Sequence, residues 1–268
     1  MSRTLMMIAP HADDAALFCG GTLAKRAREG WNVVVVRVTI DDKDSVALGV
    51  EETIERNAAE FAEAARILGV SEIVELGYPS DCLAEVSEVE LRERFIRLYR
   101  EHRPYAVFSF DPYGVLYENN QDHVRIAQAV DEAFWTAMFD KHHPEHLESG
   151  LEPHAVCERW YFARRLLEVN RYEDISDLVE TKIRAACAHQ LMMTHIVHQL
   201  WLQTKTWGRS VPEIEQAHQG DYEPVIARII REQGHRSGGL CGVTAAEPFR
   251  VLRFGALDDW FEHAAVDN

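Results

Sequence analysis

Thr4-Leu5-Met6-Met7-Ile8-Ala9-Pro10-His11-Ala12-Asp13-Asp14 is the stretch that decides the fold. Its first six residues form an uninterrupted apolar run, which is typical of a strand buried inside a sheet. A histidine and two adjacent carboxylates follow at once, and burying such groups is costly unless something offsets their desolvation. A bound cation would do so. The stretch therefore predicts a central strand with a metal site at its end, and a metal site in turn indicates hydrolysis.

The first half of the chain alternates predicted strands with predicted helices. Further strands are expected at 32–40, 73–76 and 105–110, and helices at 20–30, 51–68, 86–100 and 122–140. This order implies an α/β protein with a Rossmann-like three-layer fold, a mainly parallel sheet and right-handed crossovers. Ligands of such sheets bind at the carboxyl ends of the strands. His11, Asp41 and Asp111 all fall just past predicted strand ends.

The second half of the chain is less regular. A polar, His-rich loop is expected at 141–153, strands at 159–164 and 248–254, and long helices at 176–195 and 221–233. No repeat, low-complexity segment or linker divides the chain. We therefore predict a single domain over 1–268, in which 1–140 form the parallel core and 141–268 cover the site.

The chain is strongly acidic, and this charge excludes some classes of partner. It has 268 residues, with 28 Lys and Arg against 44 Asp and Glu, and a formal net charge of −16. Nucleic acid and anionic membranes repel such a protein, so neither is expected as a partner. Hydrophobic residues make up 47% of the chain, which suffices for one large α/β core.

Cysteine usage and the N-terminal residues favour a cytoplasmic protein. The five cysteines are scattered and form no CxxC pair, which is typical of reduced thiols. The first residues lack the basic region and cleavage site of a secretory signal. No apolar run approaches the roughly 20 residues of a membrane helix. The long helices and the His-rich loop are compatible with an assembly of identical chains.

A third metal ligand is expected where the fourth strand leads into the next helix. Zinc catalysis needs three protein ligands and an open position for water. Asn120-Gln121-Asp122-His123 lies at the same predicted sheet edge as His11, so His11, Asp14 and His123 form a reasonable ligand set. Asp13 remains beside the metal, where a carboxylate can take a proton from bound water.

These motifs resemble those of a known family. Pro10-His11-Ala12-Asp13-Asp14, followed by Cys19-Gly20-Gly21-Thr22-Leu23-Ala24, is similar to the His-Pro-Asp-Asp-Glu signature of the LmbE-like, or PIG-L, N-deacetylases and to the helix after it. Asp122-His123 resembles the end of the family's second motif, His-Pro-Asp-His. The resemblance implies a zinc-dependent hydrolase of acetamide-type bonds, acting on amino sugars or sugar-containing metabolites.

The resemblance also assigns roles residue by residue. It implies that His11, Asp14 and His123 bind one zinc ion or another divalent metal. It implies that Asp13 is the general base and Asp122 an orienting carboxylate.

Three positions depart from the family pattern. Ala12 replaces a proline, which relaxes the turn, and Ala15 replaces a glutamate. Asn120 stands where the second motif has its first histidine, which in the family helps with the oxyanion or the leaving amine. Asn can donate a hydrogen bond to an oxyanion but supplies no proton in this pH range. Either Asp13 then makes both proton transfers, or a histidine enters from a pool in the second half: His142, His143, His146, His189, His195 and His198.

Other patterns have both a structural and a functional interpretation. The carboxylates of Asp41-Asp42-Lys43-Asp44 belong to a solvated loop or meet hydroxyls or an ammonium group of a substrate. Gly20-Gly21 lacks the remaining residues of a phosphate loop, which favours close helix packing. Arg56 and Glu60 predict a surface ion pair on one helix.

Competing functions remain open at this point. Two histidines and a carboxylate are also the ligands of non-haem iron oxygenases, but alternating α/β elements favour the hydrolase. Ala15 and Asn120 leave room for a non-catalytic, ligand-binding protein. They also leave room for hydrolysis of a non-acetyl amide or a related C–N bond.

Overall fold

A computed structural model describes residues 2–253 and 257–266. Within these residues seven strands form one sheet in the order β3-β2-β1-β4-β5-β7-β6. The strands are β1 (Thr4–Ala9), β2 (Asn32–Thr39), β3 (Glu72–Tyr78), β4 (Ala106–Phe110), β5 (Glu158–Phe162), β6 (Arg171–Asp174) and β7 (Ala246–Leu252). The pairs among β1 to β5 are parallel, whereas β7 runs antiparallel to β5 and β6. The predicted, mainly parallel sheet is confirmed.

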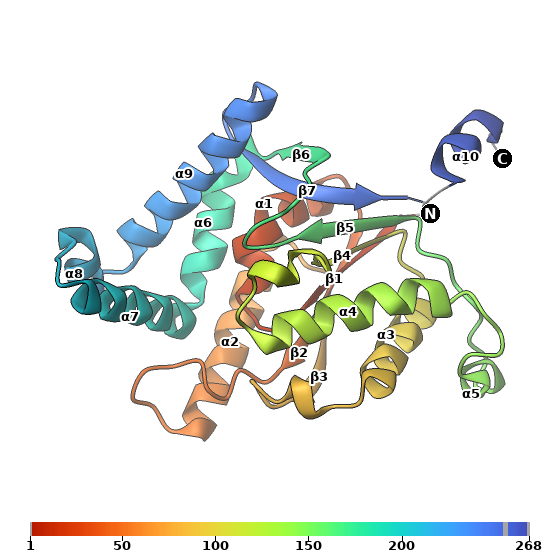
Figure 1. Ribbon diagram of the computed structural model, residues 1–268, viewed down its shortest axis with the longest axis horizontal. Helices are drawn as coiled ribbons and strands as arrows, with labels where there is room; N and C mark the ends of the chain where they lie inside the picture. Colours follow the sequence, from red (N-terminus) through yellow and green to blue (C-terminus); the bar gives the residue numbers. More distant parts are fainter. Residues whose placement is uncertain (1, 254–256, 267–268) are drawn as a thin grey trace.

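Helices cover both faces of this sheet (Figure 1). The helices of the first half are α1 (Asp14–Arg28), α2 (Val50–Leu68), α3 (Glu88–His102) and α4 (Gln121–Thr136), with short turns η1 (Leu83–Glu85) and η2 (Gly114–Tyr117). Those of the second half are α5 (Pro144–Glu148), η3 (Ser176–Leu178), α6 (Val179–Ala188), α7 (Gln190–Trp207), α8 (Pro212–His218), α9 (Glu223–Cys241) and α10 (Asp258–Ala264). In the described chain no helix is both long and apolar enough to cross a membrane.

Alternating side chains of the central strands feed two separate cores. Leu5 and Met7 of β1 point into the core shared with α1, α2 and α6, whereas Met6 and Ile8 point into the core shared with α3 and α4. Both cores are therefore built on a strand whose residues are all apolar, as the sequence predicts for a strand covered on both sides. The result is the expected three-layer fold.

The connection order reverses at β1, which is where open α/β sheets form a ligand crevice. The chain moves from β1 to β2 on one side and later returns to pair β4 with the other side of β1. Such a reversal separates the loops that leave neighbouring strands and is where open α/β sheets bind ligands. The turn after β1 and the loop after β4 flank this crevice.

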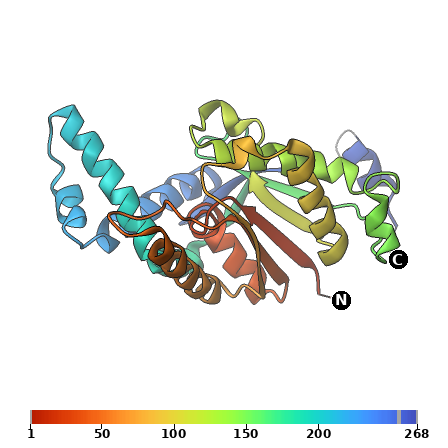
Figure 2. The ribbon, with the colours of Figure 1, turned by 90° about the horizontal axis from the view of Figure 1, so that it is seen from below.

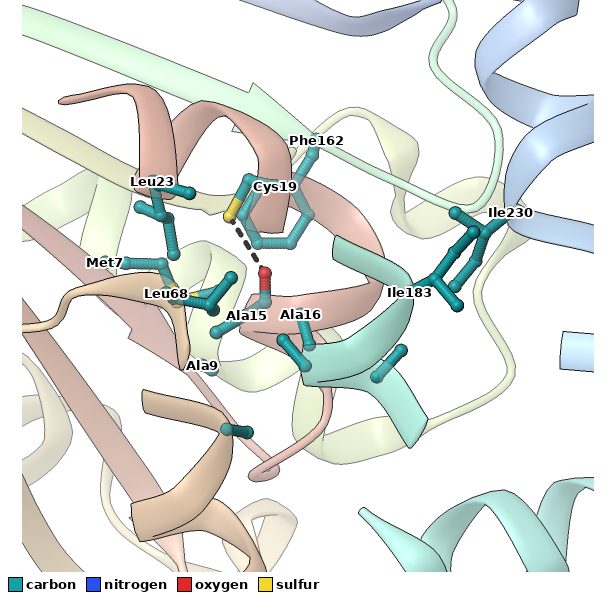
Figure 3. Close-up of a cluster of buried hydrophobic side chains, with 14 of the residues drawn as sticks. Met7, Ala9, Ala15, Ala16, Cys19, Leu23, Leu68, Phe162, Ile183 and Ile230 are labelled. Atoms are coloured by element: carbon teal, nitrogen blue, oxygen red, sulfur yellow. Dashed lines mark hydrogen bonds between the residues drawn. The ribbon is translucent and has the colours of Figure 1, made fainter. Parts of the chain in front are cut away.

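Helix α1 bends at Cys19, whose backbone is non-helical (φ −137°, ψ 17°). The Cys19 thiol donates to the carbonyl oxygen of Ala15 within the first segment (Figure 3). The second segment begins at the paired glycines, and the Glu247 carboxylate accepts the N–H groups of Gly21 and Thr22 at 3.0 and 2.7 Å. A carboxylate at a helix N-terminus satisfies donors that the helix itself leaves free, so β7 fixes the direction of this segment.

The predicted helix over 176–195 is wrong as one element. A turn (η3), α6 and α7 occupy this segment, and His189 between the helices has a non-helical backbone (φ −79°, ψ 66°). The new helix begins there because Glu60 of α2 accepts the N–H of Leu191 at 2.8 Å. The predicted Arg56–Glu60 pair forms at 3.6 Å, and Arg56 also donates to the Gln190 side chain at 3.2 Å.

Other parts of the second half also differ from expectation. The segment 141–153 contains the short helix α5, and the sequence analysis did not predict β6, α8 or α10. The expected strand at 248–254 ends at Leu252 in the described chain, and its last predicted residue lies outside the described residues. Figure 2 shows the helices α7 and α8 projecting from the body of the molecule, with the loop between β2 and α2 running toward α7.

Candidate metal centre

The first motif forms a tight turn between β1 and α1. The backbone N–H of His11 donates to Asp14 Oδ2 at 3.0 Å, and that of Ala12 donates to Asp41 Oδ2 at 3.3 Å. Asp41 follows β2, so the neighbouring strand helps to hold the turn. The histidine and both carboxylates of the motif are thus fixed at the carboxyl edge of the sheet.

The three predicted ligands converge beside this turn. His11 Nδ1 lies 3.1 Å from His123 Nε2, and the Asp14 carboxylate lies 3.6 Å from the first nitrogen and 3.5 Å from the second. All three side chains are buried. Two nitrogens bound to a tetrahedral zinc at about 2.0 Å are about 3.3 Å apart. The spacing of these atoms therefore fits a zinc ion with small adjustments.

The outer nitrogen of each imidazole faces a carboxylate. His123 Nδ1 lies 3.0 Å from Glu118 Oε2, and His11 Nε2 lies 3.5 Å from Asp122 Oδ2. A neutral imidazole carries one N–H. In the tautomer in which each ring donates this N–H to its carboxylate, both inner nitrogens present lone pairs to each other and to Asp14, an arrangement that suits a bound cation. Carboxylates of this kind stand behind most metal-bound histidines.

Main-chain donors hold the Asp122 carboxylate in turn. It accepts the N–H of Asp81 at 2.7 Å and that of Leu83 at 3.2 Å, both from the segment after β3. Asp122 is fully buried. Its position beside His11 agrees with the orienting role expected from the sequence, and that role stays a prediction.

Opposite pKa shifts separate the two adjacent carboxylates of the turn. Burial and the charge of Asp14 raise the pKa of Asp13 well above its usual value. Burial opposes the ionised form of Asp14 as well, but His123 and His11 outweigh it and lower the pKa of Asp14. Burial also disfavours charged His11, yet Asp122 and Asp14 raise the pKa of His11 well above its usual value.

Two more carboxylates reach this edge from the loop after β2. Asp41 is fully buried with a left-handed backbone (φ 54°), and its carboxylate accepts hydrogen bonds from Arg37 and Thr39. Burial raises the pKa of Asp41 to about 7 and also raises the pKa of Asp44. Asp41, Asp44 and His11 offer ligand atoms within 4.8 Å of one another. The interpretation of a solvated loop is therefore wrong for Asp41.

Asn120 and Asp111 have structural partners. The Asn120 side-chain oxygen accepts the N–H of Asp122 at 2.9 Å, which makes Asn120 the N-cap of α4. Its contact with an oxyanion stays a prediction. Asp111 accepts two hydrogen bonds from the Arg250 guanidinium, at 2.8 and 2.7 Å, and thereby joins β4 to β7.

Glu118 is a functional candidate that the sequence analysis missed. It lies five residues before His123 in the loop after β4, and a loop spacing of five has no periodicity that would place the two side chains together. The only signal was a single acidic residue after the run Gly114–Tyr117. His195 also reaches this edge from α7, where its Nδ1 lies 3.9 Å from Asp44 Oδ1.

The mainly parallel sheet and the convergent ligand atoms define an α/β protein with a candidate metal site at the carboxyl ends of its strands. The chain belongs to the PIG-L family. The family's model, described as GlcNAc-PI de-N-acetylase, matches residues 6–134. That range holds the turn after β1 and the loop after β4, so it contains all three candidate ligands. The relatives named below are deacetylases, and this protein is a hydrolytic enzyme as well.

Named relatives agree with this assignment. The chain is 30% identical over 203 residues to a diacetylchitobiose deacetylase from Thermococcus kodakarensis, a match covering 74% of this chain and 73% of that protein. It is 28% identical over 160 residues to 1D-myo-inositol 2-acetamido-2-deoxy-alpha-D-glucopyranoside deacetylase from Mycobacteroides abscessus, covering 50% and 57%.

A solved structure shares the whole fold. The N,N'-diacetylchitobiose deacetylase from Pyrococcus horikoshii superposes with a TM-score of 0.76 at 24% identity. The match covers 98% of this chain and 87% of that chain. The irregular second half is therefore part of the shared architecture.

Proposed function

We propose that this protein is a zinc-dependent hydrolase that removes the acetyl group from an N-acetylated amino sugar or a small sugar-containing metabolite. The observation that carries the proposal is the pair of inner imidazole nitrogens of His11 and His123, 3.1 Å apart beside Asp14. The names of two relatives supply the substrate class, since both describe deacetylases of N-acetylated sugars.

His11, Asp14 and His123 would hold the zinc ion. When bound, zinc polarises an amide carbonyl and lowers the pKa of a coordinated water. Glu118 and Asp122 keep the two imidazoles in the tautomer that leaves the inner nitrogens free.

Asp13 is the residue that takes the proton of the attacking water. Its carboxylate makes no capping bond to α1 and lies beside the ligand Asp14. Burial favours its protonated form once it has accepted the proton, whereas a nearby cation favours the ionised form before the reaction. General-base catalysis of this kind contributes about 10²–10⁴-fold.

The experiment uses purified protein loaded with zinc and a panel of amides containing N-acetylglucosamine, N,N'-diacetylchitobiose and the N-propionyl analogue of the former. Release of free amine is measured for the wild type and for Asp13→Asn. We expect the wild type to release amine and the variant to lose at least about 10²-fold in kcat. Zinc content should stay the same, because Asp13 is not a ligand.

Two outcomes would contradict the proposal. Retained turnover in Asp13→Asn would exclude this residue as the base. A zinc-loaded wild type that releases no amine from any member of the panel would exclude sugar deacetylation. Preference for the propionyl compound would move the assignment to a different acyl group.

A further inference from the structure

The proposed reaction requires a proton for the departing nitrogen, and Asn120 does not supply one. Its side-chain oxygen is engaged as the cap of α4, and an amide has no proton to lose near neutral pH. The sequence leaves six histidines of the second half as candidates. Their positions in the structure separate them clearly.

Three of these histidines lie at the wrong end of the sheet. His142 and His143 directly precede α5 and His146 lies within it, and Figure 1 shows α5 far from α7. Arg100, near the end of α3, binds the backbone of the first two and the ring of the third. That end of α3 leads into the start of β4, so these histidines lie at the amino edge, opposite the metal centre.

Two others lie on the side of the metal centre but are held by packing. His189 is 1% exposed and its ring lies against Phe61, so a substrate has no access to it. His198 Nδ1 lies 3.0 Å from His218 Nε2, which ties α7 to α8. Both rings are committed to packing.

His195 is both accessible and close to the site. Its side chain is 27% exposed, and its Nδ1 lies 3.9 Å from Asp44 Oδ1. Asp44 in turn belongs to the group of ligand atoms within 4.8 Å that includes His11. Asp44 therefore stands between the metal centre and α7.

Asp44 has the properties of a residue that meets a substrate. Its second oxygen, Oδ2, is buried and accepts no hydrogen bond from any described residue. A buried acceptor without a donor is costly, and an N–H or O–H of a bound sugar would satisfy it. The first oxygen faces His195 Nδ1 at 3.9 Å, the separation of an ion pair and longer than a hydrogen bond, so that Asp44 favours a protonated ring whose Nε2 is left for another partner. In the described chain no hydrogen bond to His195 Nε2 is found.

We propose that His195 is the proton donor of the reaction and that Asp44 positions it. This inference rests on the proposed deacetylation. The oxygen–carbon bond forms as water gives one proton to Asp13. The carbon–nitrogen bond then breaks, its electron pair stays on nitrogen, and the proton on His195 Nε2 moves to that nitrogen. The products are acetic acid and the free amine, after which Asp13 returns its proton to solvent and His195 regains one.

A leaving-group comparison tests this role. An amide of an amino sugar needs a proton on its nitrogen, whereas 4-nitrophenyl acetate releases an anion that needs none. For zinc-loaded His195→Gln we expect kcat on N,N'-diacetylchitobiose to fall by about 10²–10⁴-fold, with less than about a threefold change on the ester. Asp44→Asn should show the same selectivity with a smaller loss. His198→Gln, one helical turn away, is the matched control and should change neither substrate by more than about twofold.

A binding measurement gives a second, independent readout. In protein with ¹⁵N-labelled histidines, glucosamine, which carries the amino group of the expected product, should shift the His195 ring signals and leave those of His198 unchanged, with or without zinc. Equal loss on amide and ester, or full amide activity in His195→Gln, would overturn the inference while leaving the deacetylase assignment intact. A wild type without amide turnover would instead contradict the proposed function itself.

Discussion

At the scale of single residues, His189 is the most unusual buried side chain. Both of its ring nitrogens are buried and have no hydrogen-bond partner among the described residues. Burial lowers the pKa of His189 to about 4, from an ordinary value of 6.5. The folded protein therefore keeps this ring neutral at a pH where the unfolded chain binds a proton.

This difference predicts a loss of stability in mild acid. Because the folded pKa is lowered, the unfolded state takes up more protons as pH falls from 6.5 toward 4, and unfolding becomes easier by about 2 kcal/mol at about pH 5. His189→Leu removes this effect. The free energy of unfolding in urea, compared between about pH 7 and about pH 5, should therefore fall less for the variant than for the wild type. His142→Leu, at an exposed position, should lose as much free energy of unfolding between the two pH values as the wild type. An equal loss in all three proteins would contradict the prediction.

Adjacent site residues were predictable from sequence, and distant partners were not. His11, Asp13 and Asp14 share one turn at the end of an apolar strand, so strand ends and charge were enough to find them. His123 required only the parallel order of the strands. Glu118 reaches its partner through loop geometry, and Asp44 reaches His195 through the docking of α7, and neither leaves a periodic pattern.

At the scale of elements, the close approach of α1 to its neighbours explains the paired glycines. A Cβ on Gly21 would lie 2.7 Å from Ile175 Cγ2, whereas one on Gly20 would lie 3.5 Å from its nearest neighbours, Leu68 and Lys182. The expectation of close packing is thus correct for Gly21 in particular.

Substitution by alanine should affect stability differently at the two glycines. Gly21→Ala forces the new methyl group against Ile175 and should lower the free energy of unfolding by about 1–3 kcal/mol. Gly20→Ala meets only ordinary contacts and should leave stability unchanged or raise it by up to about 1 kcal/mol, because alanine favours helices. Urea denaturation of both variants measures the difference. Similar losses in the two proteins would show that the close approach to Ile175 is not the cause.

Boundaries of elements were predictable where the signal was local. The end of α2 was marked by Gly69, which has the expected left-handed backbone (φ 76°). The break between α6 and α7 has no glycine or proline, and it depends on Glu60, which lies far away in the sequence. A helix end produced by a tertiary contact leaves no sign in its own residues.

At the scale of the whole molecule, the two halves of the chain share one sheet. β4 of the first half pairs with β5 of the second, and the buried Asp111–Arg250 pair joins β4 to β7. β1, β2 and β4 were predictable because each is a mostly apolar, buried run, and the short apolar segment 73–76 indicated β3. The four residues of β6 are too few and too polar for such a signal, and the antiparallel end of the sheet was accordingly missed.

Breaking the Asp111–Arg250 pair should weaken the whole fold. Arg250→Met leaves a buried carboxylate without its partner, which costs about 3–5 kcal/mol. The double variant Asp111→Asn with Arg250→Met removes the unpaired charge and should regain part of that loss. Urea unfolding of the wild type, both single variants and the double variant gives the coupling energy. Purely additive losses would contradict the prediction.

The order of the strands also determines when the candidate metal site forms during folding. His11 and His123 lie 112 residues apart in the chain, yet they meet across the neighbouring strands β1 and β4. A nascent chain that has emerged only as far as β3 holds His11 and Asp14 but lacks His123, the third candidate ligand. Under the proposed function, the metal site would be complete only once β4 has paired with β1. The pairing of β1 with β4 joins segments that are distant in sequence, which is a slow kind of folding step. Metal binding would then report that this pairing is complete.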